Sequence, residues 1–201
     1  ETFEVSACVR GVFTLNRLIK TPKKRYRFHI VRECAEIEQL TDALPGDGEV
    51  FKLMSAGGFS SIGFVRFVAL RTHVRTLTVT TLRVGAQQLA VLDVLKQQGR
   101  LGHVRFVIGS VMKHNTQRGK LYQYWERFVE VCQKNGWEYV VESNHSKLLL
   151  FDTASGKYVL ETSSNLNENP SAEQFSFERS AELHDFYAGA VAELFGGERG
   201  E

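Results

Sequence analysis

The feature that most constrains this fold is a regular alternation of strand-like and helix-like segments from Glu49 onward. The strand-like segments are short and rich in β-branched or alternating apolar residues, at 50–55, 76–84, 104–110, 137–141, 147–151, 157–162 and 173–179. The helix-like segments are longer and amphipathic, at 60–72, 86–98, 117–134 and 181–195. This alternation predicts an α/β fold, layered α/β/α, with a mixed, largely parallel sheet.

The first 48 residues have a different organisation. Residues 11–32 alternate apolar and polar side chains on either side of Thr21-Pro22, which predicts a β-hairpin. Residues 33–44 carry apolar side chains at helical spacing. Pro45-Gly46-Asp47-Gly48 then interrupts any regular element. We therefore expect an N-terminal hairpin and helix extension at 1–48 and one catalytic domain at 49–201.

The composition is that of a folded protein without a membrane span. Of the 201 residues, 43% are hydrophobic and 24% are charged, and no apolar run approaches the roughly 18 residues that a span needs. No basic start precedes an apolar stretch, so we expect no signal peptide and a cytoplasmic location. Cys8, Cys34 and Cys132 form no CxxC pair, which excludes a cysteine zinc site and indicates reduced thiols.

The net charge of +2 hides a strong asymmetry along the chain. Residues 51–120 hold eleven Lys or Arg and a single acid, Asp93, whereas residues 161–201 hold nine acids and two bases. A basic surface attracts polyanions, so this bias favours a nucleic-acid partner. The alternative is that these arginines are ordinary solvated residues at helix ends and strand edges.

One stretch, Asn144-His145-Ser146-Lys147 followed by four apolar residues and Asp152, carries the chemistry. His145 and Lys147 are two residues apart and therefore point to the same side of a strand. A hairpin from 147 to 162 would bring Ser163 and Asn165 back beside them. An imidazole, an ammonium, a hydroxyl and a carboxamide at one point suit a phosphoryl group.

These residues resemble the signature of the phospholipase D superfamily. His145, Lys147 and Asp152 match its H-x-K-x4-D motif, and Ser163 and Asn165 match the following G-S-x-N-like segment. The resemblance covers roughly three-quarters of the chain and implies a phospholipase D-like module. It implies that His145 is the nucleophile of a covalent phosphohistidine and that Lys147 and Asn165 bind the phosphoryl oxygens, with Ser163 assisting.

The resemblance has specific implications at three positions. Glu178 stands where many members carry a glutamate that orients the histidine. By the same resemblance, Asp152 orders the site rather than touching substrate. Thr162 stands where the family usually has glycine, and a positive φ or a close backbone approach there would make threonine costly.

The resemblance also implies how the chain assembles. Full-length members carry two copies of the motif, because the leaving oxygen needs a proton from a second histidine. This chain carries one copy, since no other histidine has Lys two residues later: His29, His73, His103, His114 and His184. We therefore expect a homodimer with a composite active site. No metal and no cofactor are expected, because lysines and histidines supply the positive charge.

The first functional hypothesis is a metal-independent phosphodiesterase, a homodimeric DNA endonuclease, with DNA favoured over RNA. It rests on the basic bias and on the absence of an amphipathic segment that would dock on lipid, so no stable membrane association is expected. The second hypothesis, supported by Thr162, is a nucleic-acid-binding module of the same fold with weak catalysis. The third is a phospholipase or phosphatidyl transferase.

Overall fold

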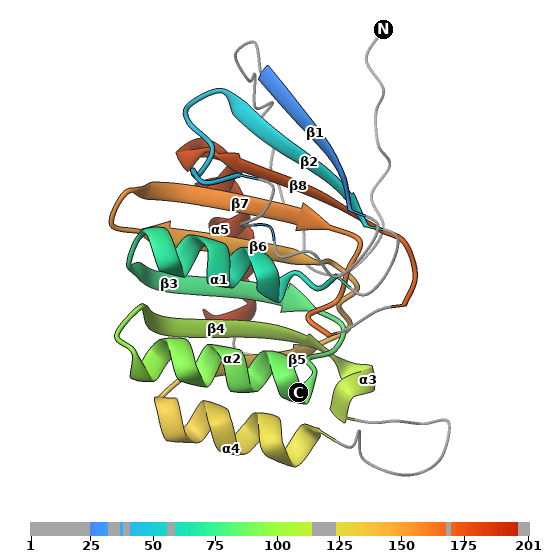
Figure 1. The fold of residues 1–201 in the computed structure, drawn as a ribbon. Coiled ribbons are helices and arrows are strands. Elements are labelled where there is room, and N and C mark those ends of the chain that lie inside the picture. Colours follow the sequence, from blue (N-terminus) through green and yellow to red (C-terminus); the bar gives the residue numbers. More distant parts are fainter. Residues whose placement is uncertain are drawn as a thin grey trace, which may run out of the picture.

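The computed structural model describes residues 25–31, 37, 41–55, 59–113, 124–167 and 170–196. Over these residues the chain forms an eight-stranded sheet in the order β1-β2-β8-β7-β6-β3-β4-β5 (Figure 1). The strands are β1 Arg25–Val31, β2 Glu49–Ser55, β3 Val74–Thr81, β4 Leu101–Gly109, β5 Glu138–Glu142, β6 Leu148–Thr153, β7 Gly156–Thr162 and β8 Glu173–Arg179.

The sheet is mixed, as the sequence predicts. In the described chain three strand pairs are parallel, β1 with β2, β3 with β4 and β4 with β5. Four are antiparallel, β2 with β8, β3 with β6, β6 with β7 and β7 with β8. More strand pairs are antiparallel than an alternation of strands and helices predicts. The reason is that β6 turns directly into β7, and β8 follows β7 without an intervening helix.

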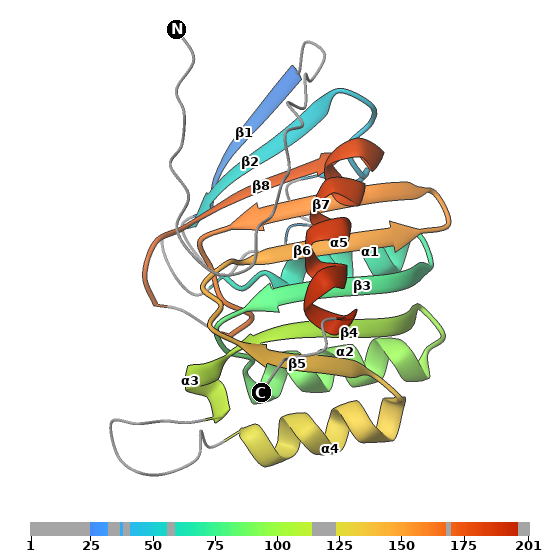
Figure 2. The same cartoon turned by 180° about the vertical axis from the view of Figure 1, so that it is seen from behind.

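Helices cover both faces of this sheet. α1 Ile62–Arg71, α2 Ala86–Gln97 and α4 Trp125–Asn135 lie on one face, and α5 Ala181–Gly196 crosses the other (Figures 1 and 2). A short helix, α3 Ser110–Lys113, follows the end of β4. The layered α/β/α architecture is therefore confirmed.

Most of the strands finish at one end of the sheet. β2, β3, β4, β5 and β7 finish at this end, and β6 and β8 begin there. We call it the site end, on the right of the sheet in Figure 1, and we call the other the opposite end. In α/β sheets, ligands bind beyond the carboxyl ends of parallel strands, which here is the site end.

An aromatic core fixes the strands that lead into the site end. Phe59 and Phe64 are core residues, 3% and 0% exposed. Their rings pack on Phe175 of β8 with centroids 5.2 and 5.5 Å apart, and Phe64 also lies 5.3 Å from Phe177. Buried aromatic contacts of this kind pin the start of β8 against α1.

The N-terminal part joins the same sheet. β1 pairs in parallel with β2, with Arg25 opposite Glu49 and Val31 opposite Ser55. The first arm of the expected hairpin and most of the expected helix at 33–44 lie outside the described residues. β1 is thus an edge strand added to the sheet of the expected catalytic domain.

The sequence predicts reduced thiols and no membrane span, and the described residues bear on both expectations. Cys132 is buried on α4, and burial raises the pKa of its thiol to about 12, so it stays protonated and unreactive. Cys8 and Cys34 lie outside the described residues. In the described part of the chain, every helix is too short or too polar to cross a membrane.

Candidate active site

The histidine and lysine of the motif lie together at the site end, just before β6. His145 is exposed and Lys147 is half-buried. The Lys147 Nζ donates to the His145 carbonyl oxygen at 2.8 Å and lies 3.3 Å from the His145 Nδ1. An ammonium has only hydrogens to offer, so Nδ1 is the acceptor in this contact. The pair places a cation directly beside an exposed imidazole.

The expected hairpin brings the second motif segment to the same place. Leu148 lies opposite Glu161 in the pairing of β6 with β7, and the Thr162 N–H donates to the Lys147 carbonyl at 3.2 Å. Ser163 and Asn165 therefore follow β7 at the site end, beside the start of β6.

Asn165 is oriented by the end of β3. Its Oδ1 accepts the main-chain N–H of Leu82 at 3.1 Å, and the next residue, Leu166, donates its N–H to the Thr81 hydroxyl at 3.0 Å. Because Oδ1 is held by the main chain, the Nδ2 hydrogens are the part of the carboxamide that can donate to an anion.

Ser163 contacts a glutamate that sequence reasoning missed. Its hydroxyl donates to the Glu173 carboxylate and accepts the Gln174 N–H at 3.0 Å. Glu173 is 7% exposed, and its main chain is bound to Ser55 at the end of β2. A carboxylate therefore lies beside Ser163 at the site end. A local signal existed, since Glu173 opens the predicted strand at 173–179.

Glu178, the glutamate that the sequence analysis assigned to the site, lies on the other face of the sheet from Lys147. Thr162 lies opposite Phe175 on β8 and beside Lys147, the residue just before β6, so these three side chains share one face of the sheet. Glu173, two residues before Phe175, shares that face. Glu178 is three residues after Phe175 and lies opposite Val159, so it points to the other face.

The surroundings of Glu178 agree with this placement. It is also five residues from Glu173 along β8, about 17 Å of extended chain. Burial raises the pKa of Tyr187 on α5, and the hydrogen bond to Glu161 and the charges of Glu161 and Glu178 add to this shift. Glu178 therefore faces the α5 side of the sheet, and Lys147 faces the other side.

Asp152 lies at the opposite end of β6 from His145. It is paired with Thr76 of β3 and Lys157 of β7, and its Oδ1 forms an ion pair with Arg75 Nη2 at 2.6 Å. The length of β6 separates it from the reacting groups. The expectation that Asp152 orders the structure rather than touching substrate fits this position.

Thr162 occupies regular strand backbone, which removes one concern raised by its identity. It is the last residue of β7 and needs no left-handed conformation. Its hydroxyl donates to the Gln174 carbonyl at 2.9 Å and accepts the Ser164 N–H at 2.9 Å. The threonine side chain thus stabilises the turn into the Ser163–Asn165 segment.

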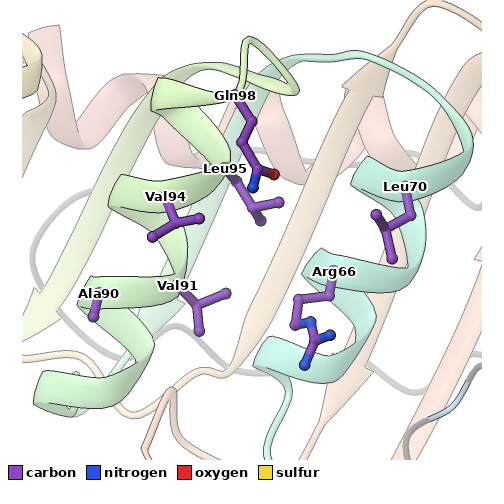
Figure 3. A pocket seen from close by; sticks show the side chains of 7 residues that line it. All are labelled: Arg66, Leu70, Ala90, Val91, Val94, Leu95 and Gln98. Carbon is purple, nitrogen blue, oxygen red and sulfur yellow. The ribbon is translucent and has the colours of Figure 1, made fainter.

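Two other kinds of site are separate from this cluster. Among the described residues, no three His, Cys, Asp or Glu side chains gather to hold a metal ion. A groove of 390 Å³ lies between α1 and α2 (Figure 3), lined by Arg66, Leu70, Ala90, Val91, Val94, Leu95 and Gln98. None of the residues discussed above for the site end lines this groove.

Comparison with known proteins shows the fold. The chain matches no protein-family model. It matches no curated protein by sequence. Solved structures with a similar fold include two with a TM-score of 0.55 each. One is the polyphosphate kinase of Porphyromonas gingivalis, 15% identical over 76% of this chain and only 27% of that chain. The other is Nuc of Salmonella typhimurium, a phospholipase D family member, 16% identical over 73% of this chain and 93% of that chain.

Proposed function

From this phospholipase D-like fold, we propose that the chain is a metal-independent phosphodiesterase that works through a covalent phosphohistidine on His145. The observation that supports it most directly is the contact between Lys147 and the exposed His145 at the site end. The convergence of Ser163 and Asn165 on the same end adds neutral donors. This set provides a nucleophile, a cation and hydrogen-bond donors for one phosphoryl group.

The proposed first step is in-line displacement at phosphorus. A deprotonated ring nitrogen of His145 forms a bond to phosphorus while the bond from phosphorus to the leaving oxygen breaks, and that oxygen takes a proton from a general acid. Lys147 Nζ and Asn165 Nδ2 stabilise the negative charge on the non-bridging oxygens. In the second step water attacks phosphorus, loses its proton to the same acid–base group, and releases His145.

Glu173 is the glutamate we assign to the site in place of Glu178. It is buried, shares a face of the sheet with Lys147, and accepts a hydrogen bond from Ser163. A buried carboxylate behind a catalytic histidine stabilises the imidazolium and fixes the ring. We propose that Glu173 has this role when substrate is bound.

The general acid comes, in this proposal, from a second copy of the chain. One chain carries one H-x-K motif, and its His145 is exposed at the site end. A two-fold dimer that joins two site ends brings two histidines and two lysines to one phosphate. Size-exclusion chromatography with light scattering tests the dimer. Mixing wild type with excess His145→Ala tests the shared site, because each mixed dimer lacks one of the two histidines and the activity of the wild-type chains should fall.

DNA is the substrate we favour, ahead of RNA. The chain is basic over residues 51–120, and at the site end Lys113 is exposed beyond β4. A phosphodiester backbone carries one charge per nucleotide and binds such surfaces in a salt-dependent manner.

The deciding experiment is cleavage of labelled single- and double-stranded DNA in excess EDTA. Wild type is compared with His145→Ala and with His73→Ala, an exposed histidine at the opposite end that serves as the matched control. We expect cleavage by wild type and by His73→Ala only. DNA binding without cleavage would support the non-catalytic binding module instead. Hydrolysis of phospholipid vesicles, without action on DNA, would support the lipid enzyme.

A further inference from the structure

Asn144, the residue before His145, is bound to two strand ends at once. Its Nδ2 lies 3.3 Å from the carbonyl oxygen of Thr81 at the end of β3 and 3.3 Å from that of Val107 on β4. Its Oδ1 accepts the Ser146 N–H at 3.0 Å, which closes an Asx turn around His145. The carboxamide therefore connects the histidine turn to the body of the sheet.

Ser146, the residue after His145, is anchored as well. Its hydroxyl donates to Asn144 Oδ1 at 2.6 Å and is also 2.9 Å from the Thr80 hydroxyl. The Thr80 hydroxyl accepts the Leu148 N–H at 3.0 Å. Both neighbours of His145 are thus fixed, while the His145 side chain itself is exposed.

The end of β4 is shaped to admit this turn. A Cβ atom on Gly109 would lie 3.0 Å from the Asn144 carbonyl oxygen and 2.6 Å from Leu82 Cδ1. The first distance is to main chain, which cannot rotate away as a side chain can. The glycine therefore permits the close approach of the Asn144 main chain to β4.

We propose that Asn144 is a positioning residue that holds His145 in the geometry needed for attack on phosphorus. The inference rests on the proposed function and assigns Asn144 no contact with substrate. An exposed nucleophile on a turn has several accessible orientations, and only those near the attack geometry react. Displacement of a reacting group by about 1 Å can cost on the order of 100-fold in rate.

A purely structural role is the alternative, and the chain offers a matched control. Asn135 at the end of α4 is also half-buried, and its Nδ2 also donates two hydrogen bonds, to Asp93 Oδ1 at 2.9 Å and to the Val131 carbonyl at 3.0 Å. Its loss removes comparable bonds far from the site end. A general loss of stability would affect both variants alike.

The first test measures kcat and KM for phosphodiester cleavage by Asn144→Ala, Asn144→Asp and Asn135→Ala. We expect kcat to fall about 30- to 100-fold in both Asn144 variants, with KM within about threefold of wild type. Asp retains the acceptor for Ser146 but loses the donor to the strand ends, so it should not restore activity. Asn135→Ala should keep kcat within twofold. Equal losses in Asn144→Ala and Asn135→Ala would overturn the proposal.

The second test is independent of activity. Nuclear magnetic resonance relaxation at the His145 amide reports the order of the turn, whether or not the chain cleaves a phosphodiester. We expect the order parameter to fall from about 0.85 to below about 0.6 in Asn144→Ala, and to stay unchanged in Asn135→Ala. An unchanged value in Asn144→Ala would overturn the proposal. An inactive wild type that still shows the fall would mean that the proposed function is wrong while Asn144 still orders the turn.

A third variant tests the close contact between this turn and β4. Gly109→Ala leaves every Asn144 hydrogen-bonding group in place but pushes on its main chain. We expect a lower kcat with a cooperative thermal transition retained. Full activity in folded Gly109→Ala would contradict the need for this close approach. If the variant does not fold, the Asn144 tests above decide.

Discussion

The two ends of β6 hold different parts of one sequence motif, in different surroundings. At the site end, Lys147 contacts the exposed His145, and within the described chain it forms no ion pair. At the opposite end, Asp152 is paired with Arg75 at 2.6 Å. One strand thus has an exposed imidazole beside a cation at its start and an ion pair near its finish.

The same contrast extends across the sheet. Carboxylates at or toward the opposite end pair with cations: Asp185 with Lys157, Asp47 with Arg179 and Asp93 with Lys134. Arginines there also bind main-chain carbonyls, Arg71 those of 41, 42 and 67 and Arg100 those of 69 and 70. Within residues 51–120, Arg75 and Arg105 also pair with carboxylates. Part of the basic bias of this segment therefore serves the fold, and fewer of its charges are left for a polyanion than their count indicates.

The sharpest test of this contrast replaces one lysine at each end of the sheet with alanine. Lys147→Ala should lower kcat by on the order of 10³-fold, because it removes the cation that stabilises the phosphoryl oxygens. Lys157→Ala, which removes the partner of Asp185, should leave kcat within twofold. Steady-state kinetics on the proposed DNA substrate measures both. Similar losses in the two variants would show that the ends do not differ as described.

Two glutamates on β8 provide the next largest difference. Glu173→Gln should lower kcat by on the order of 100-fold, because it removes the carboxylate on the site face. Glu178→Gln should change kcat less than twofold, because that side chain faces α5. Both are buried, at 7% and 6% exposed, so the pair is matched for burial. The reverse order of effects would restore the assignment of Glu178.

Asp152→Asn should act on stability and not on the reaction. The Arg75 and Asp152 side chains are 55% and 31% exposed, and exposed pairs contribute about 0.2–1 kcal/mol to the free energy of unfolding. Urea denaturation should show a loss in this range, with kcat unchanged. A large loss of kcat in a stably folded Asp152→Asn would place this residue in the reaction.

The smallest expected effect is on how thermal stability depends on pH under acid conditions. Hydrogen bonds from Lys134 and Asn135 and the charge of Lys134 hold the pKa of Asp93 below its ordinary value despite partial burial. A lowered folded pKa contributes stability above the unfolded value of about 3.9, and this is lost as the pH falls toward the folded value. Thermal unfolding between pH 5 and about 2 should therefore depend less on pH in Asp93→Asn. An identical pH dependence would contradict this account.

Local patterns in the sequence predicted which motif residues lie together at the site end. His145 and Lys147 share a side because strands have a period of two, and a short hairpin returns Ser163 and Asn165 to the same end. These relations involve fewer than about 25 residues of chain. Local strand and hairpin geometry is therefore enough to bring the motif residues together.

Only the tertiary structure shows whether Glu173 or Glu178, which lie on one predicted strand, shares a face of the sheet with Lys147. The choice depends on the register of β8 against β7, and a shift of one residue would move every side chain to the other face. The anchors of Asn144 are likewise set by carbonyls on β3 and β4, 63 and 37 residues away. The sequence determined which groups follow each strand. Their final partners depended on how distant strands align, because strand register is a property of the packed sheet and not of any one segment.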